Sequence, residues 1–195
     1  VAKTEVLRIL KEGGETPSFI QSGLAGVSIG DIEVYVSEAL SEEMLEETVS
    51  GALSVLCRNI EPGDYFSLNA FLPFTGEGRR EALEEIRHCV AEKYGVPSCL
   101  EIGPRYLHST GQLHKGGQNN GVFLVLSANE PRDIEVSNAK AQSLGQLEKA
   151  QAMGDFAILS ERGRRCVHIH LPNNSSVTLR LLSKVLRHVV ERVAE

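Results

Sequence analysis

The sequence lacks tryptophan, has only two methionines, and contains four tyrosines and six phenylalanines in 195 residues. It contains no apolar run near the roughly 18 residues that a transmembrane helix requires, so we expect no membrane partner. Lys and Arg (20) are outnumbered by Asp and Glu (26), which gives a net charge of −6. A protein that binds nucleic acid usually presents a basic face, so we expect no nucleic-acid partner either. Because 42% of the residues are hydrophobic, the composition also excludes a disordered chain.

The spacing of the cysteines and the first residues of the sequence also carry information. The four cysteines, Cys57, Cys89, Cys99 and Cys166, form no C-x-x-C pair. We interpret them as small apolar side chains in a reducing compartment and predict a cytoplasmic location. The chain starts at Val1 with helix-like sequence and shows no targeting segment. We therefore expect a piece of a longer protein.

The hydrophobic pattern alternates between helical and strand-like periodicity along the chain. It predicts strands over 31–36, 65–72, 99–102, 122–126 and 167–171, and a loop over the Gly-rich residues 18–30. Helices are predicted over 2–12, 41–58, 79–94, 139–161 and from 175 or 176 to 193, with the fourth broken near Gly154 and Asp155. Such alternation predicts α/β architecture. We expect one three-layer domain over residues 1–195, with a mostly parallel or mixed sheet of about five strands and helices on both faces.

The segment 103–121, GPRYLHSTGQLHKGGQNNG, has no periodicity and follows a predicted strand. Long polar loops inside compact domains usually carry function, and glycines let a backbone approach a ligand closely. Ligands of open α/β sheets bind beyond the carboxyl ends of strands. A loop that packs on itself is the plainer alternative. The candidate ligand-binding residues are Arg105, Tyr106, His108, Ser109, Thr110, Gln112, His114, Lys115, Gly116, Gly117 and Asn120.

Six histidines raise the question of acid–base or metal chemistry. His108 and His114 are candidate acid–base groups, because imidazole titrates near neutral pH. His168 and His170 should share one face of a strand, and with His108 and His114 they would offer four nitrogen ligands. No carboxylate accompanies them in sequence. We therefore predict no metal and no cofactor, and keep a histidine-based metal enzyme as a third hypothesis.

Basic residues cluster at Arg162, Arg164 and Arg165. A solvated surface is the plainer interpretation of this cluster, and a contact with phosphate or a partner is the alternative.

Several runs resemble the C-terminal region of bacterial bifunctional transaldolase/glucose-6-phosphate isomerase fusion proteins. They are DYFSLNAFLP from Asp64, GPRYLHSTGQLHKGG from Gly103, AQAMGD from Ala150, Gly163-Arg164-Arg165, and the strand that ends in His170-Leu171. The resemblance spans roughly residues 60–171. The sequence departs from that pattern at Gln118, where proline is usual, and at SNAKAQSLGQL, where a Pro-Gly and aromatic stretch is typical.

The resemblance implies a sugar-phosphate enzyme of glycolysis and the pentose phosphate pathway. Its isomerase would interconvert glucose 6-phosphate and fructose 6-phosphate without a metal or an organic cofactor. The carboxylate fingerprints of such isomerases and the transaldolase barrel are absent from this sequence, so we expect the isolated chain to be inactive. Lys3 is a candidate for the end of the isomerase's catalytic lysine signature. The segment 103–121 would then bind sugar phosphate or the upstream isomerase module, or serve a non-catalytic docking domain.

Overall fold

The computed structural model describes residues 26–29, 31–76, 78–136 and 143–193. Its strands form one mixed sheet in the order β1-β2-β6-β5-β3-β4. They are β1 (Gly26–Ile29), β2 (Ile32–Val36), β3 (Tyr65–Phe71), β4 (Ser98–Ile102), β5 (Gly121–Ala128) and β6 (Arg165–Leu171). Neighbours among β3, β4, β5 and β6 are parallel, whereas β1 and β2 form an antiparallel hairpin that extends the sheet beside β6.

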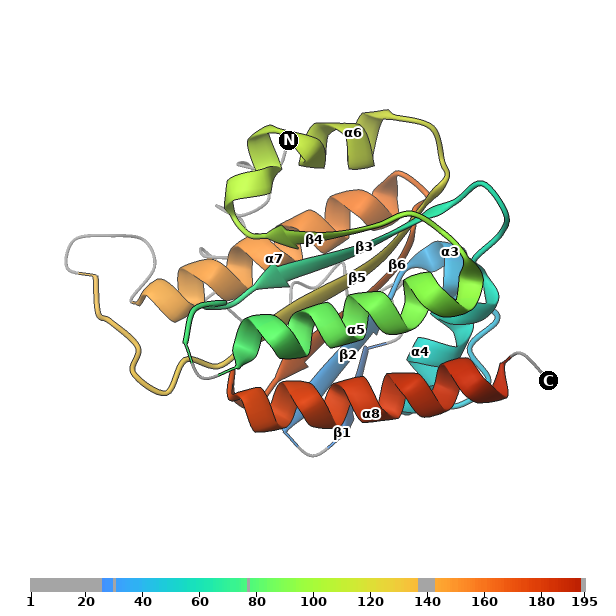
Figure 1. Cartoon of the computed structure of the whole chain (residues 1–195). Helices are drawn as coiled ribbons and strands as arrows, with labels where there is room; N and C mark the ends of the chain where they lie inside the picture. The colour runs from blue at the N-terminus through green and yellow to red at the C-terminus, as the bar shows by residue number, and fades with distance from the viewer. Residues whose placement is uncertain (1–25, 30, 77, 137–142, 194–195) are drawn as a thin grey trace.

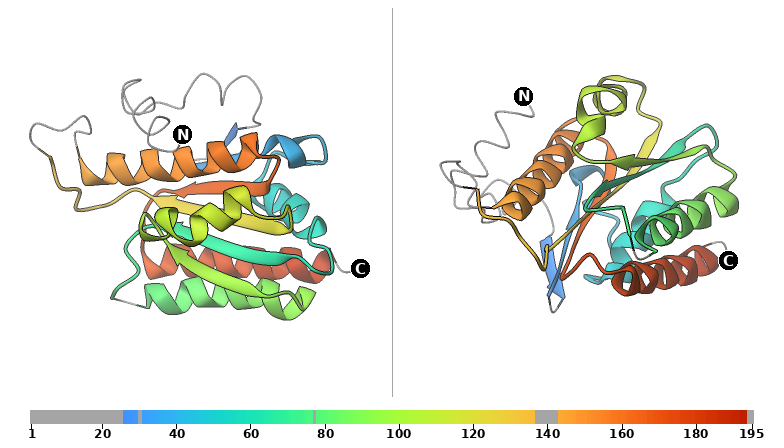
Figure 2. Two further views of the ribbon diagram at one scale, coloured as in Figure 1. Left: turned by 90° about the horizontal axis from the view of Figure 1, so that it is seen from above. Right: turned by 60° about the vertical axis from the view of Figure 1, so that its left-hand side comes forward.

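Helices cover both faces of the sheet, so the predicted three-layer α/β class is confirmed (Figures 1 and 2). The helices α4 (Val49–Arg58), α5 (Arg79–Tyr94) and α8 (Ser176–Arg192) pack on one face. On the other face lie α6 (Thr110–Gly116), α7 (Leu144–Glu161) and the short 3-10 helix η1 (Arg105–His108). A short helix, α3 (Glu38–Ser41), follows β2.

The two faces of the sheet differ in polarity because side chains alternate along each strand. On the α5/α8 face, β5 contributes Val122, Leu124 and Leu126 to a large apolar core. On the α7 face, buried aromatic and apolar side chains are interspersed with polar ones. The buried polar side chains that β3, β5 and β6 present there are Ser67, Asn69, Ser127, His168 and His170. The α7 face is therefore the one with chemical groups to use.

Two segments of the structure differ from the secondary structure predicted from sequence. Gly26–Ile29, predicted as part of a loop, pairs with β2 from Gly26 opposite Tyr35 to Ile29 opposite Ile32. Main-chain pairing to an existing strand overrides the weak strand propensity of glycine. The helix predicted over 139–161 corresponds to α7, which the structure describes from Leu144 to Glu161. This helix runs unbroken through Gly154 and Asp155. The helix predicted over 2–12 and Lys3 lie outside the described residues.

The helix predicted over 41–58 is wrong over 42–48, because these residues between α3 and α4 form turns and bends. The acidic residues Glu42, Glu43, Glu46 and Glu47 lie in this connection rather than in the first turn of a helix. The N-cap is Thr48, whose Oγ1 accepts a hydrogen bond from Gly51 N at 2.9 Å. Ser41, at which the predicted helix would begin, instead donates to the carbonyl of Glu38 at 3.0 Å.

Thr48→Ala is expected to lower the free energy of unfolding by about 1 kcal/mol, because it leaves an N–H of the first turn of α4 without its acceptor. Ser41→Ala is the matched control and should change the same quantity by less than about 0.5 kcal/mol. Urea unfolding of both variants measures the difference. A larger loss in Ser41→Ala than in Thr48→Ala would contradict the assignment of Thr48 as the N-cap of α4.

Among the helices that the structure describes, none is long and apolar enough to cross a bilayer.

Candidate functional site

The segment 103–121 is mostly helical, not the aperiodic loop predicted from its sequence. It leaves the carboxyl end of β4, forms η1 and α6, and returns across the α7 face to the start of β5. Glycine fits at position 111 because a Cβ there would lie 2.9 Å from the carbonyl oxygen of Tyr106. Tertiary packing thus stabilises a seven-residue helix whose own propensity is poor.

This geometry divides the candidate residues into an inner and an outer set. Tyr106 and His114 are buried against the sheet, and Lys115, Gly117 and Asn120 are half-buried. The outer set is exposed and consists of Arg105, His108, Ser109, Thr110, Gln112 and Gly116. Gln112 donates to the carbonyl of Leu107 at 2.9 Å. The two sets face different surroundings, so they do not form one site.

The inner set is organised by Asp155, a buried carboxylate in the middle of α7. The hydroxyl of Tyr106 donates to Asp155 Oδ2, and Lys115 Nζ forms an ion pair with Asp155 Oδ1. The side chains of Lys115 and Asp155 are 12% and 1% exposed, respectively. Burial and the Asp155 carboxylate raise the pKa of Tyr106 well above its ordinary value, so this phenol stays protonated.

Two arginines of the basic cluster, Arg164 and Arg165, make internal contacts, whereas Arg162 is exposed. Arg164 is buried and donates to the carbonyls of Lys115 and Gly117 at 3.1 and 2.7 Å. Arg165 makes a bidentate contact with Asp64, with both N···O distances at 2.8 Å. Solvation of Arg164 and Arg165, the plainer interpretation, is therefore wrong for these two residues. Arg164 fastens the end of α6 to β6, whereas Arg165 holds the turn that precedes β3.

His114 lies in an aromatic enclosure under α6. Its ring centroid is 5.1 Å from that of Phe123, 5.8 Å from that of Tyr65 and 6.0 Å from that of Tyr106. Its Nδ1 is buried and has no hydrogen-bond partner in the described part of the chain. Burial lowers the pKa of His114 to about 4, so the imidazole is neutral at pH 7.

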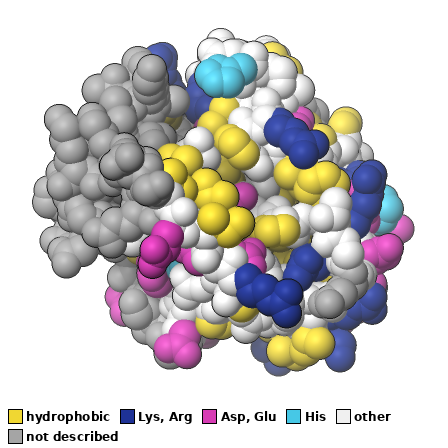
Figure 3. Space-filling view, turned by 90° about the vertical axis from the view of Figure 1, so that its left-hand side faces the viewer, with side chains coloured by type: hydrophobic (Ala, Val, Ile, Leu, Met, Phe, Trp, Pro, Cys, Tyr) yellow, Lys and Arg dark blue, Asp and Glu magenta, His cyan; other side chains and the backbone are white. Residues whose placement is uncertain are grey.

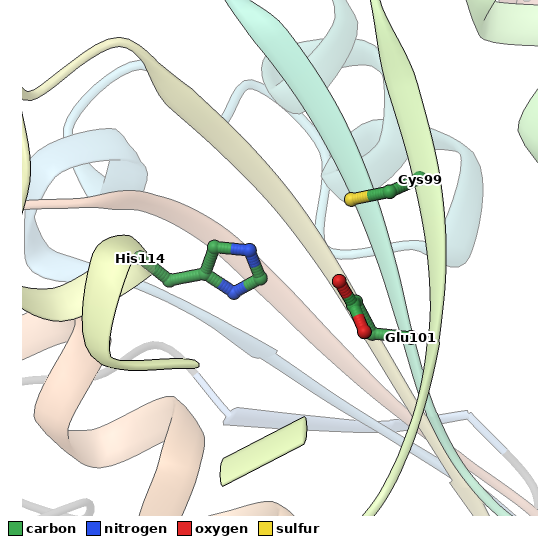
Figure 4. A group of neighbouring side chains, drawn as sticks. All are labelled: Cys99, Glu101 and His114. Atoms are coloured by element: carbon green, nitrogen blue, oxygen red, sulfur yellow. The ribbon is translucent and has the colours of Figure 1, made fainter. Parts of the chain in front are cut away.

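Two polar side chains of β4 point toward His114 from the edge of the sheet (Figure 4). Cys99, Glu101 and His114 each offer one donor atom, and these three atoms lie within 4.8 Å of one another. The Cys99 thiol contacts Ser67 Oγ at 3.2 Å, and burial raises its pKa. This is the one group of three potential metal ligands found among the described residues.

A second polar network lies on the same face, between β5 and β6. Ser127 Oγ is 2.8 Å from both His168 Nε2 and His170 Nδ1, and His170 Nε2 is 3.0 Å from Asn129 Oδ1. If Asn129 Oδ1 accepts, neutral His170 carries its proton on Nε2, so Ser127 donates to Nδ1 and accepts from His168. His168 and His170 do share one face, as predicted. They bind Ser127 rather than joining His108 and His114 in a metal site, so the predicted four-histidine arrangement is wrong.

A cavity of about 370 Å³ opens at the carboxyl edge of the sheet, on the face shown in Figure 3. Pro73 follows β3 and Glu130 follows β5, and the helices after these adjacent strands lie on opposite faces. Such a switch point is where open α/β sheets usually bind ligands. Here Asp133 Oδ1 accepts from Gly145 N at 2.8 Å, so an internal carboxylate occupies the start of α7. A phosphate would meet that negative charge.

Sequence reasoning missed Asp155, Cys99, Glu101 and Arg164 as members of the site. Asp155 carried a usable signal, because it interrupts the otherwise apolar run AMGDFAIL. Burial of a carboxylate requires partners, so such an interruption marks a polar cluster. Cys99 and Glu101 alternate on a short edge strand and carry no local sign of their proximity to His114. The cysteines are all free, and Cys99 is the one that is only half-buried.

No protein-family model matches the chain, and no curated protein matches it. Among solved structures, it resembles the crystal structure of a hypothetical protein from Thermus thermophilus, with a TM-score of 0.57 and 18% identity. The match covers 78% of this chain and 43% of that protein, so the chain spans less than half of its length. At this identity the likeness concerns the fold alone.

Proposed function

We propose that this chain is the C-terminal domain of a cytoplasmic sugar-phosphate enzyme in which glucose-6-phosphate isomerase and transaldolase modules are fused. Within that enzyme it acts as a docking domain. One observation supports this role: the sequence runs that resemble such fusions converge on one buried cluster. Tyr106 and Lys115 come from the run that starts at Gly103, Asp155 from AQAMGD, and Arg164 from Gly163-Arg164-Arg165.

The internal contacts favour docking over phosphate binding on the inner side of the segment. Lys115, the predicted phosphate ligand, is paired with Asp155, and Arg164 is held by two carbonyls. A bound phosphate would have to displace a buried carboxylate from Lys115, which is unfavourable. The inner residues therefore position α6, and its outer surface remains for a partner.

The outer surface of η1 and α6 combines charge with an apolar side chain. Leu113 is 62% exposed, and Arg105 and His108 are exposed nearby in sequence. An exposed leucine on such a surface suits a protein partner better than a sugar, because its burial against a partner removes apolar area from water. We assign this surface, defined by Arg105, His108, Gln112 and Leu113, to the upstream isomerase module.

Sugar phosphate binding by the outer set is the second candidate. Arg105 supplies a cation, and Ser109 and Thr110 supply exposed hydroxyls. In this arrangement the ligand would lie between this chain and the isomerase module. The chain alone would then bind the sugar phosphate weakly and would catalyse no reaction.

The docking role can be tested in the protein encoded by the complete reading frame. Leu113→Asp is expected to lower isomerase kcat/KM at least fivefold, because it places a charge in the interface. Leu181→Asp is the matched control, since Leu181 is 56% exposed on α8, across the sheet, and this variant should retain activity. Equal isomerase activity of the Leu113→Asp and Leu181→Asp variants would contradict the proposed docking surface. Absence of both isomerase and transaldolase activity from the unmodified protein would remove the proposed enzyme.

A further inference from the structure

We propose that Cys99, Glu101 and His114 bind one zinc ion between β4 and α6. This site is independent of the proposed docking role and lies on the inner side of the segment that carries it. The three donor atoms already lie within 4.8 Å of one another (Figure 4). Tetrahedral zinc with ordinary bond lengths separates sulfur, nitrogen and oxygen donors by about 3.4–3.6 Å. A shift of about 1 Å would therefore close the site around the ion.

The strand register places two of the ligands. Cys99 and Glu101 are two residues apart on β4, so both side chains project to the α7 face. They pair with Ser67 and Asn69 of β3, which present their side chains on the same face. Since β4 is an edge strand, these ligands are only half-buried, which leaves a route for an ion from solvent.

His114 supplies the third ligand. Its ring lies under α6 with one nitrogen, Nε2, on the side of Cys99 and Glu101 (Figure 4). A metal ion there would bind the lone pair of Nε2, with the ring proton on Nδ1. The neutral imidazole, already favoured by burial, is the form that binds a metal.

The donor set selects the kind of ion. One sulfur, one nitrogen and one carboxylate oxygen do not suit Mg²⁺ or Ca²⁺, which bind through oxygen. Zinc accepts all three, and three protein ligands leave its fourth position for water. A thiolate and a carboxylate also neutralise the charge of Zn²⁺.

Binding would ionise the Cys99 thiol, because the thiolate is the ligand. The S–H bond breaks, the sulfur–zinc bond forms, and the proton passes to the buffer. In the metal-free chain the thiol stays protonated and contacts Ser67 Oγ at 3.2 Å. The side chain exchanges this weak contact for the ion.

The experiment is titration of the full chain, first freed of metal by chelation, with Zn²⁺ and with Co²⁺ as a spectroscopic probe. We expect one ion per chain, release of about one proton per ion at pH 7.5, and a thiolate-to-Co²⁺ charge-transfer band. Cys99→Ser should abolish the band, and Glu101→Gln should weaken Zn²⁺ binding at least 10-fold. Glu101 is half-buried, so its variant tests the site without emptying the core.

Cys89→Ser is the matched control, because Cys89 lies on α5 on the opposite side of the sheet. It should retain the stoichiometry, the affinity and the band. Circular dichroism should show that all three variants are folded. The proposal would be overturned if the unmodified chain does not bind Zn²⁺, or if Cys99→Ser and Glu101→Gln both bind it as tightly as the unmodified chain does.

Discussion

Lowering the pH from 7 to 5 is expected to reduce the free energy of unfolding by about 2 kcal/mol through His170 alone, and to reduce it further through His168. Both side chains are buried, with 0% and 1% exposure, and both are held neutral. Burial lowers the pKa of His170 to about 4 and holds that of His168 well below its ordinary 6.5. Lys149 lowers and Glu33 raises the pKa of His170 to a smaller extent.

The direction follows from which state binds protons. Below pH 6.5 the unfolded chain protonates both histidines, whereas in the folded chain burial keeps His170 neutral down to about pH 4 and holds the pKa of His168 well below 6.5. Stability from these groups is therefore complete above pH 6.5 and is lost as the pH falls from 6.5 toward 4. Glu148 acts in the opposite direction, since burial raises its pKa, but it is one group against three, because burial also lowers the pKa of His114.

Urea unfolding at pH 7, 6 and 5, with a chelator present, measures this loss. His168→Gln should reduce the slope below pH 6 by about 1.4 kcal/mol per pH unit, because it removes one titrating group. His188 is exposed on α8, so His188→Gln is the control and should leave the slope unchanged. A free energy at pH 5 within about 1 kcal/mol of that at pH 7 would contradict buried neutral histidines.

Asp155→Ala should lower the free energy of unfolding by about 3–5 kcal/mol, which is the usual cost of breaking a buried ion pair. The substitution leaves the Lys115 ammonium without its counter-ion and the Tyr106 hydroxyl without its acceptor. Tyr106 belongs to η1 and Lys115 to α6, so η1 and α6 should detach first. Urea unfolding measures the loss, and hydrogen exchange of residues 105–117 locates it.

Two comparisons separate this effect from the loss of any surface charge. Glu33→Gln breaks the ion pair between Glu33 and Lys149, whose side chains are 31% and 28% exposed, respectively. It should lower the free energy of unfolding by less than about 1 kcal/mol. Combining Asp155→Ala with Lys115→Met should recover part of the loss, because no buried charge remains unpaired. If Asp155→Ala and Glu33→Gln cost the same, the buried cluster does not hold α6.

Elements with strong local patterns were predicted closely. The helix over 79–94 matches α5, and Gly95 ends it with a φ of 63°, a conformation that favours glycine. The runs in β3, β5 and β6 also matched their strands within one or two residues. In each case hydrophobic periodicity or a glycine stop acts over a few neighbouring residues. Interactions between residues close in sequence were sufficient to determine these elements.

The errors share one cause, which is stabilisation by partners distant in sequence. Asp155 was taken as a break in a helix, but its carboxylate is satisfied by Tyr106, 49 residues away, and so α7 continues. The segment 103–121 was taken as aperiodic, but Arg164 and Asp155 fasten it as a helix. Helix propensity describes neither contact.

The sequence by itself determined the α/β alternation, the position of most elements and the segment in which the polar cluster lies. Only the tertiary structure decided which polar side chains meet. The register aligns Cys99, Ser67, Phe123 and Cys166 across four strands, and α6 then brings His114 onto this row. Spacing along a strand predicts which face a side chain occupies. Its neighbours depend on strand order and on the helix packed above, which arise only when the whole chain buries its apolar surface.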